Sequence, residues 1–109
     1  MANAQTVVSV YRPKPGCREP LLDLVRRHVP RLAELGLAGS APVVLLQSSK
    51  DGSLLEIFDW RDAAAVEEAH ESPAVMSLWK AFGELAECVP LASLEEAGAP
   101  FAHFERVPL

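Results

Sequence analysis

The segment from Ile57 to Phe82, IFDWRDAAAVEEAHESPAVMSLWKAF, changes within a few residues from the alternation of a strand to the spacing of helices. Asp62 precedes three alanines, and its carboxylate can accept hydrogen bonds from the free N–H groups of a starting helix. Ser72 followed by Pro73 predicts a second helix start, because proline at the first helical position lacks an N–H that is not needed there. The segment therefore predicts a strand end, a short helix, a break and a longer helix.

The longer helix has one apolar face, opposite Lys80, Glu84 and Glu87. A stripe of this kind needs a sheet to lie on. Its members recur at three- and four-residue spacing: Val75, Leu78, Trp79, Phe82, Leu85, Ala86 and Val89.

Two further elements precede this segment. Gln5 to Arg12 is rich in β-branched residues and ends at a Pro- and Gly-containing turn, so it predicts a first strand. Arg18 to Leu35 predicts a helix with His28 in its apolar stripe, and Pro30 predicts a kink or a restart near Val29. The strand has two mostly apolar faces, which predicts cover on both sides; one carries Val8, Val10 and Arg12, the other Val7, Ser9 and Tyr11.

The remaining strands complete the topology. Residues 42–47 and 53–60 flank an Asp-Gly turn and predict a hairpin, and residues 101–107 alternate as a last strand after an irregular stretch. The order β-α-β-β-α-β predicts an α+β, ferredoxin-like fold, a four-stranded antiparallel sheet with its helices on one face. Because the strands are apolar on both faces, we expect a homodimer joined through the bare sheet face, closing a barrel-like core.

Composition narrows the class of protein. The 109 residues fit one domain, 1–109, with loose ends at 1–4 and 108–109, and half of them are hydrophobic. The net charge of −5 argues against a nucleic-acid partner, and no apolar run is long enough to cross a bilayer. Cys17 and Cys88 lack partners at metal-ligand spacing, so we expect no metal site, no disulfide and a reducing, cytoplasmic location.

The layout resembles the dimeric α/β-barrel proteins typified by antibiotic-biosynthesis monooxygenases and quinol monooxygenases. The resemblance depends most on the acidic-aromatic strand end Glu56–Trp60, the helix from Ala63 to His70, and the step Ser72-Pro73. It implies a pocket between helices and sheet, and oxygenation of a phenolic or quinol substrate without metal or flavin. One subgroup degrades haem with an asparagine and a histidine, but Ser9 and the surroundings of Trp79 stand at those positions, so no cofactor is expected.

The histidines are the first candidates for catalysis. His70 shares a helix face with Val66 and could accept a proton from a phenol; the alternative is a helix-end histidine bonded to nearby carbonyl groups. His28 either lines a cavity as a ligand-binding residue or is a core histidine with a partner.

Other side chains are candidates for ligand binding. Ser9 and Tyr11 offer a hydroxyl pair if their face meets the helices, and Arg12 replaces them if it does not. Trp79 and Phe82 are either core residues or the wall of an aromatic pocket. Glu56 and Asp59 point to opposite faces of their strand, which argues against a paired carboxylate site.

These features leave two main hypotheses. The first is a cofactor-independent monooxygenase with His70 as base or orienting group. The second is a non-catalytic, small-ligand-binding or stress-type dimeric barrel, which a cavity filled by side chains, with His28 and His70 both bonded internally, would favour. An isomerase or decarboxylase on the same scaffold is a third alternative.

Overall fold

A computed structural model describes residues 3–109. Of the predicted loose N-terminal end, residues 1–2 lie outside this range, and Asn3 and Ala4 are exposed and in no element. The elements in chain order are β1 (Gln5–Pro13), α1 (Arg18–Glu34), β2 (Val44–Gln47), β3 (Leu54–Trp60), α2 (Ala63–His70), α3 (Pro73–Leu85), β4 (Ala86–Val89), the short 3-10 turns η1 (Leu91–Ser93) and η2 (Glu95–Gly98), and β5 (Glu105–Arg106).

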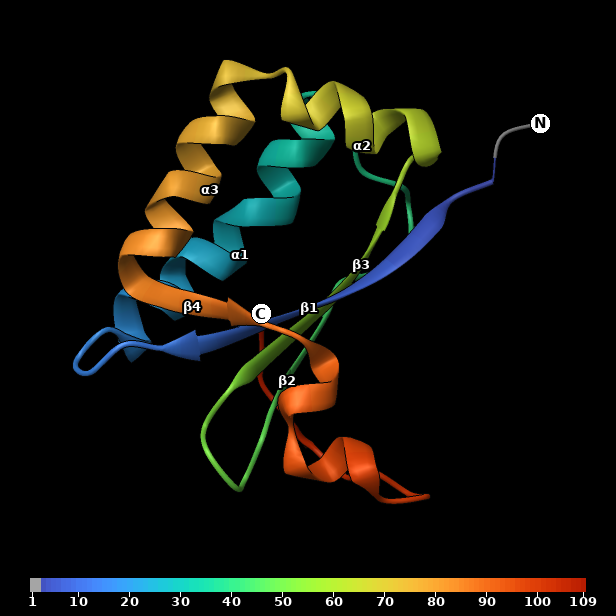
Figure 1. Cartoon of the computed structure of the whole chain (residues 1–109). Coiled ribbons are helices and arrows are strands. Elements are labelled where there is room, and N and C mark those ends of the chain that lie inside the picture. The colour runs from blue at the N-terminus through green and yellow to red at the C-terminus, as the bar shows by residue number, and fades with distance from the viewer. Residues whose placement is uncertain (1–2) are drawn as a thin grey trace.

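Residues 3–109 form one antiparallel sheet with the strand order β4-β1-β3-β2-β5. The three α-helices lie together on one face of this sheet, and the C-terminal segment crosses toward the other face (Figure 1). The α+β, ferredoxin-like fold predicted from the sequence is therefore confirmed. No helix of the described range is both long enough and apolar enough to cross a membrane.

The helix starts follow the capping residues. Asp62 Oδ1 accepts a hydrogen bond from the Ala65 N–H at 2.9 Å, and Ser72 Oγ accepts one from the Val75 N–H at 3.3 Å. Both predicted starts are confirmed. Of the kink or restart predicted near Val29, the restart does not occur, because α1 continues through Pro30 to Glu34 with Val29 and Leu32 buried on either side. The kink stays a prediction.

Two predictions for the C-terminal third are corrected by the structure. The predicted helix does not extend to Val89: α3 ends at Leu85, and residues 86–89 turn into β4, which pairs with the free edge of β1 from Val10 to Pro13. The predicted last strand, 101–107, shrinks to Glu105–Arg106 beside β2. The described sheet therefore has five strands instead of four. Hydrogen bonding to an open strand edge outweighed the helical spacing of Ala86 and Val89.

The outer sheet face, opposite the helices, is partly covered by the chain itself. Leu94 of the C-terminal segment packs on Val10 and Leu55. The chain therefore hides part of that face by itself. The cover is incomplete, because Val8 remains 39% exposed and Leu91 44% exposed.

Among the glycines of residues 3–109, Gly39 has the least space for a side chain. A Cβ added there would lie 2.9 Å from Asp59 Cβ and 3.3 Å from the Trp60 carbonyl oxygen. We expect Gly39→Ala to lower the free energy of unfolding by about 1–3 kcal/mol, because the end of β3 must move. Gly83→Ala, inside α3 with nothing within 4 Å of its Cβ, should instead stabilise the protein by up to about 1 kcal/mol. Urea titration of both variants measures the free energy of unfolding, which should fall in Gly39→Ala and rise in Gly83→Ala. Equal changes in the two variants would contradict the close approach at Gly39.

Candidate functional site

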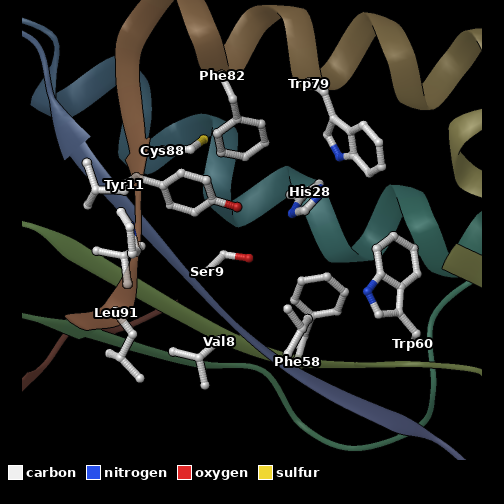
Figure 2. A pocket seen from close by; sticks show the side chains of 14 residues that line it. Val8, Ser9, Tyr11, His28, Phe58, Trp60, Trp79, Phe82, Cys88 and Leu91 are labelled. Atoms are coloured by element: carbon white, nitrogen blue, oxygen red, sulfur yellow. The ribbon is translucent and has the colours of Figure 1, made fainter. Parts of the chain in front are cut away.

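A cavity of about 460 Å³ lies against β1, between helices α1 and α3 and the β4–η1 segment, and residues from both faces of β1 line it. Figure 2 shows aromatic rings on most of its circumference and a few polar atoms directed inward. Its lining comes from β1, α1, β3, α3 and the β4–η1 segment: Val7, Val8, Ser9, Val10, Tyr11, His28, Phe58, Trp60, Trp79, Phe82, Cys88, Val89, Pro90 and Leu91.

Strand alternation decides which side chains reach the cavity from the sheet. In the β1–β3 ladder Ser9 lies opposite Glu56 and Tyr11 opposite Leu54, so these side chains share the helix-facing side. Phe58 follows Glu56 by two residues on the same side. The sheet therefore contributes two hydroxyl groups and a carboxylate to the region beneath the helices.

Three buried polar side chains meet beside this cavity. The Tyr11 hydroxyl donates a hydrogen bond to Glu56 Oε1 at 2.8 Å, and His28 Nδ1 lies 3.0 and 3.1 Å from the two oxygens of the same carboxylate. Glu56 is completely buried and His28 is 3% exposed. We refer to Tyr11, Glu56 and His28 as the buried triad.

The triad defines the tautomer of His28. A carboxylate only accepts hydrogen bonds, so the proton of a neutral imidazole lies on Nδ1 and Nε2 carries the lone pair. Nε2 has no hydrogen-bond partner among residues 3–109. His28 lines the cavity, and its Nε2 is an unused proton acceptor that the folded chain seals from solvent. A general base needs such an acceptor, and a substrate reaches this one when the side chains around it move.

Aromatic packing holds the triad in place. The rings of Tyr11 and Phe82 are stacked at 4.7 Å between centroids, and the His28 ring meets Phe82 edge-on at 4.9 Å and Phe58 edge-on at 5.5 Å. Trp60 continues this wall 5.3 Å from Phe58, and Trp79 lies 6.5 Å from Trp60. The cavity therefore offers flat, apolar walls to an aromatic ligand.

The pKa of Tyr11 is raised far above its ordinary value of 10, first because the hydroxyl is buried and then because the negative charge of Glu56 is close. The folded protein keeps this proton above pH 10, where the unfolded chain has lost it, so stability falls as pH rises. Wild type should lose about 1 kcal/mol more than Tyr11→Phe between pH 10 and pH 11. Burial also raises the pKa of Cys88, but that contribution is common to both proteins.

The measurement is urea unfolding of both proteins at several pH values. Tyr11 is the single tyrosine of the sequence, so tyrosinate absorbance reports this residue alone and should appear only on unfolding. Tyrosinate formed in the folded protein at pH 10 would contradict the raised pKa.

Comparison with known proteins supports the architecture. No family model matches the sequence. No curated protein is significantly similar to it. Among solved structures, the chain is similar to SnoaB, a cofactor-independent oxygenase from Streptomyces nogalater, with a TM-score of 0.66 and 22% sequence identity over 81% of this chain and 88% of that one. The chain has the antibiotic-biosynthesis-monooxygenase-like (ABM-like) fold. The resemblance inferred from the layout of the sequence is confirmed at the level of fold.

Within this ABM-like fold, five of the seven predicted site residues line one cavity: Ser9, Tyr11, His28, Trp79 and Phe82. The stacking of Tyr11 on Phe82 of α3 shows that the face of β1 with Ser9 and Tyr11 meets the helices. Arg12 lies on the outer face, where its Nη2 is 3.3 Å from Asp51 Oδ2 of the hairpin turn. A ligand-binding role for Arg12 was expected only if the other face of β1 met the helices.

His70 is exposed and is not among the residues lining this cavity. Its Nδ1–H donates a hydrogen bond to the Val66 carbonyl oxygen at 2.8 Å, and its ring packs against Trp79 at 5.0 Å. This geometry matches the alternative of a helix-end histidine bonded to a carbonyl group. The catalytic role of His70 stays a prediction, and His28 has the more suitable surroundings.

Glu56 and Trp60 were not proposed as site residues from the sequence. Glu56 was set aside because Asp59 points the other way, which is correct but considers only carboxylate pairs. The useful signal was a glutamate between Leu54 and Phe58 on one strand face, together with a histidine on an apolar helix stripe. A buried carboxylate needs donors, and a buried histidine supplies one. Residues 3–109 hold no cluster of three or more His, Cys, Asp or Glu residues that could bind a metal ion.

Proposed function

We propose that the protein is a cofactor-independent monooxygenase that acts on a phenolic or quinol substrate in the aromatic cavity. The observation that carries this proposal is the buried triad: His28 lines the cavity, its Nδ1 is held by Glu56, and its Nε2 is unused within residues 3–109. The fold shared with SnoaB, an oxygenase that needs no cofactor, supports the same reaction class.

The chemistry requires little from the protein. His28 Nε2 removes the proton of a substrate hydroxyl, and the electron-rich phenolate reduces dioxygen and bonds to it at a ring carbon that bears hydrogen. One oxygen atom enters the ring as a carbonyl group, and the other leaves as water with the hydroxyl hydrogen and the ring hydrogen. The apolar walls exclude bulk water from the reactive anion.

A non-catalytic binding barrel is the second candidate. It predicts a cavity filled by side chains, with His28 and His70 both bonded internally. His28 is bonded to Glu56 and His70 to the Val66 carbonyl oxygen, as this alternative expects. The cavity of about 460 Å³ favours catalysis instead.

The test is oxygen uptake by the purified protein with a panel of hydroquinones, naphthols and phenols. We expect His28→Gln to lower the rate by about 100-fold or more, the usual contribution of a general base, and His70→Ala to retain the wild-type rate. Uptake by no member of the panel would overturn the proposed reaction. An equal loss of rate in both variants would contradict the assignment of His28, and not His70, as the base.

We further propose a cytoplasmic homodimer joined through the outer sheet face, where Val8 and Leu91 are the exposed apolar side chains. Wild type should scatter light as a dimer. Val8→Lys should shift it toward a monomer, because an ammonium group cannot be buried unpaired in an interface, whereas Ala64→Lys on the exposed side of α2 should not. A wild-type monomer at micromolar concentration would contradict this proposal.

A further inference from the structure

A second pocket, of about 310 Å³, lies between the β2–β3 turn and the C-terminal segment, which run beside each other in Figure 1. Its charged and aromatic lining residues are Lys50 of the turn and Glu95, Glu96, Phe101 and His103 of the C-terminal segment. It shares no lining residue with the aromatic cavity. We refer to it as the C-terminal pocket, and an inference about it does not depend on the proposed function.

A buried carboxylate distinguishes the C-terminal pocket. Glu96 is only 8% exposed. Its Oε2 accepts a hydrogen bond from the Ser48 hydroxyl at 2.6 Å, whereas its Oε1 is sealed from solvent and has no hydrogen-bond partner among residues 3–109. A buried polar atom without a partner costs free energy, and a bound ligand or ion is one way to supply the missing group.

The missing group is a hydrogen-bond donor. Ser48 Oγ accepts hydrogen bonds from the N–H groups of Lys50 at 3.0 Å and Asp51 at 3.3 Å, so its own proton is directed to Glu96. None of the salt bridges within residues 3–109 includes Glu96. An ionised carboxylate only accepts hydrogen bonds, and a cationic donor forms the strongest of them.

The surroundings of Glu96 favour an organic ammonium group over a metal ion. Residues 3–109 contain no group of three or more His, Cys, Asp or Glu side chains that could hold a metal ion. Apolar surface lies in the same pocket, because Ala99 and Ala102 line it together with Phe101, which is 81% exposed. An alkyl chain attached to the ammonium group would remove part of this surface from water.

We propose that the C-terminal pocket binds a small primary alkylamine, whose ammonium group donates a hydrogen bond to Glu96 Oε1 and whose alkyl chain lies against Phe101. The ligand reaches this oxygen when exposed side chains of the rim, such as that of Lys50, move aside. Because Ser48 precedes the β2–β3 turn and Glu96 lies in η2, the bound amine also strengthens the attachment of the C-terminal segment to the hairpin.

Titration of the wild-type protein with two probes tests the proposal. Pentylammonium carries the required charge, and pentanol has the same alkyl chain without it. We expect pentylammonium to shift the backbone amide signals of residues 49–50 and 95–103 in a proton–nitrogen correlation spectrum, and pentanol to bind about 10-fold or more weakly. Equal binding of the two probes, or shifts confined to the aromatic cavity, would overturn the proposal.

A pair of neighbouring glutamates locates the charge that matters. Glu96→Gln keeps the size of the side chain and an acceptor for Ser48, and it should raise the Kd of pentylammonium about 10-fold or more. Glu95→Gln is the matched control, because Glu95 lines the same pocket but is exposed, and it should change the Kd less than about 3-fold. Equal effects would show that the amine responds to net charge alone, which would overturn the site at Oε1.

Lys50→Gln tests whether the chain supplies the cation itself. With Lys50 as a bystander of like charge, the variant should bind pentylammonium as well as wild type or up to about 3-fold more tightly. Binding by Lys50→Gln and not by wild type would show that Lys50 occupies Glu96 in solution, and the proposal would fall. The wild-type titration decides the outcome even if Glu96→Gln does not fold.

Discussion

Glu56→Gln should lower the rate of oxygen uptake by about 100-fold or more while the protein still folds. The amide keeps the size of the side chain but brings an N–H₂ group to His28. The imidazole can satisfy that donor by moving its proton from Nδ1 to Nε2, which leaves Nε2 without a lone pair to accept a proton. The cost in stability should be about 1–3 kcal/mol, because Tyr11 and His28 share a single carboxylate.

The rate is measured with the best substrate of the panel, beside far-ultraviolet circular dichroism as a check of folding. Glu84→Gln, an exposed change on α3 with the same loss of charge, is the matched control and should keep the wild-type rate. An unchanged circular dichroism spectrum together with a lowered kcat separates loss of the base from a general loss of structure. Full activity of Glu56→Gln would show that the buried triad does not organise the base.

Phe82→Ala should lower the free energy of unfolding by about 3–5 kcal/mol, a large share of the 5–15 kcal/mol typical of a domain. Phe82 is 2% exposed and packs against two members of the triad at once, stacked on Tyr11 and edge-on to His28. Its removal leaves a cavity that the rigid sheet cannot fill. The remaining folded fraction should also lose activity, because His28 loses one of the rings that hold it.

Urea titration measures this loss, and Phe101→Ala provides the control. Phe101 is 81% exposed, so deletion of the same ring there should change stability by less than about 0.5 kcal/mol. Similar losses in the two variants would contradict the contribution of Phe82 through its buried packing against Tyr11 and His28.

Much of the fold was predictable from short stretches of sequence. The Asp62 and Ser72 caps, the Asp-Gly turn and the alternation of β1 each concern neighbours within a few residues, where capping and periodicity act. Alternation also placed Ser9 and Tyr11 on the same side of β1. Where a residue had two competing local signals, as Ala86 and Val89 did, the helical spacing gave the wrong element.

The hydrogen bonds of the buried triad join residues far apart in the sequence, and no local sequence pattern predicted them. Tyr11, His28 and Glu56 lie in three elements, and their contacts depend on the register of β1 against β3 and on how α1 crosses both. A one-residue shift of that register would turn Glu56 toward the outer face. The sequence alone could show that a glutamate and a histidine both occupy apolar faces, but not that they share a hydrogen bond.

The sequence by itself determined the order of elements, the faces of its strands and helices, and the class of fold, because these follow from periodicity and capping over a few residues. The tertiary structure alone decided that His28 lines the cavity and His70 does not, that Glu56 joins His28 to Tyr11, and that the C-terminal segment covers part of the outer face. Those outcomes depend on distances between elements, and packing of the whole chain sets such distances.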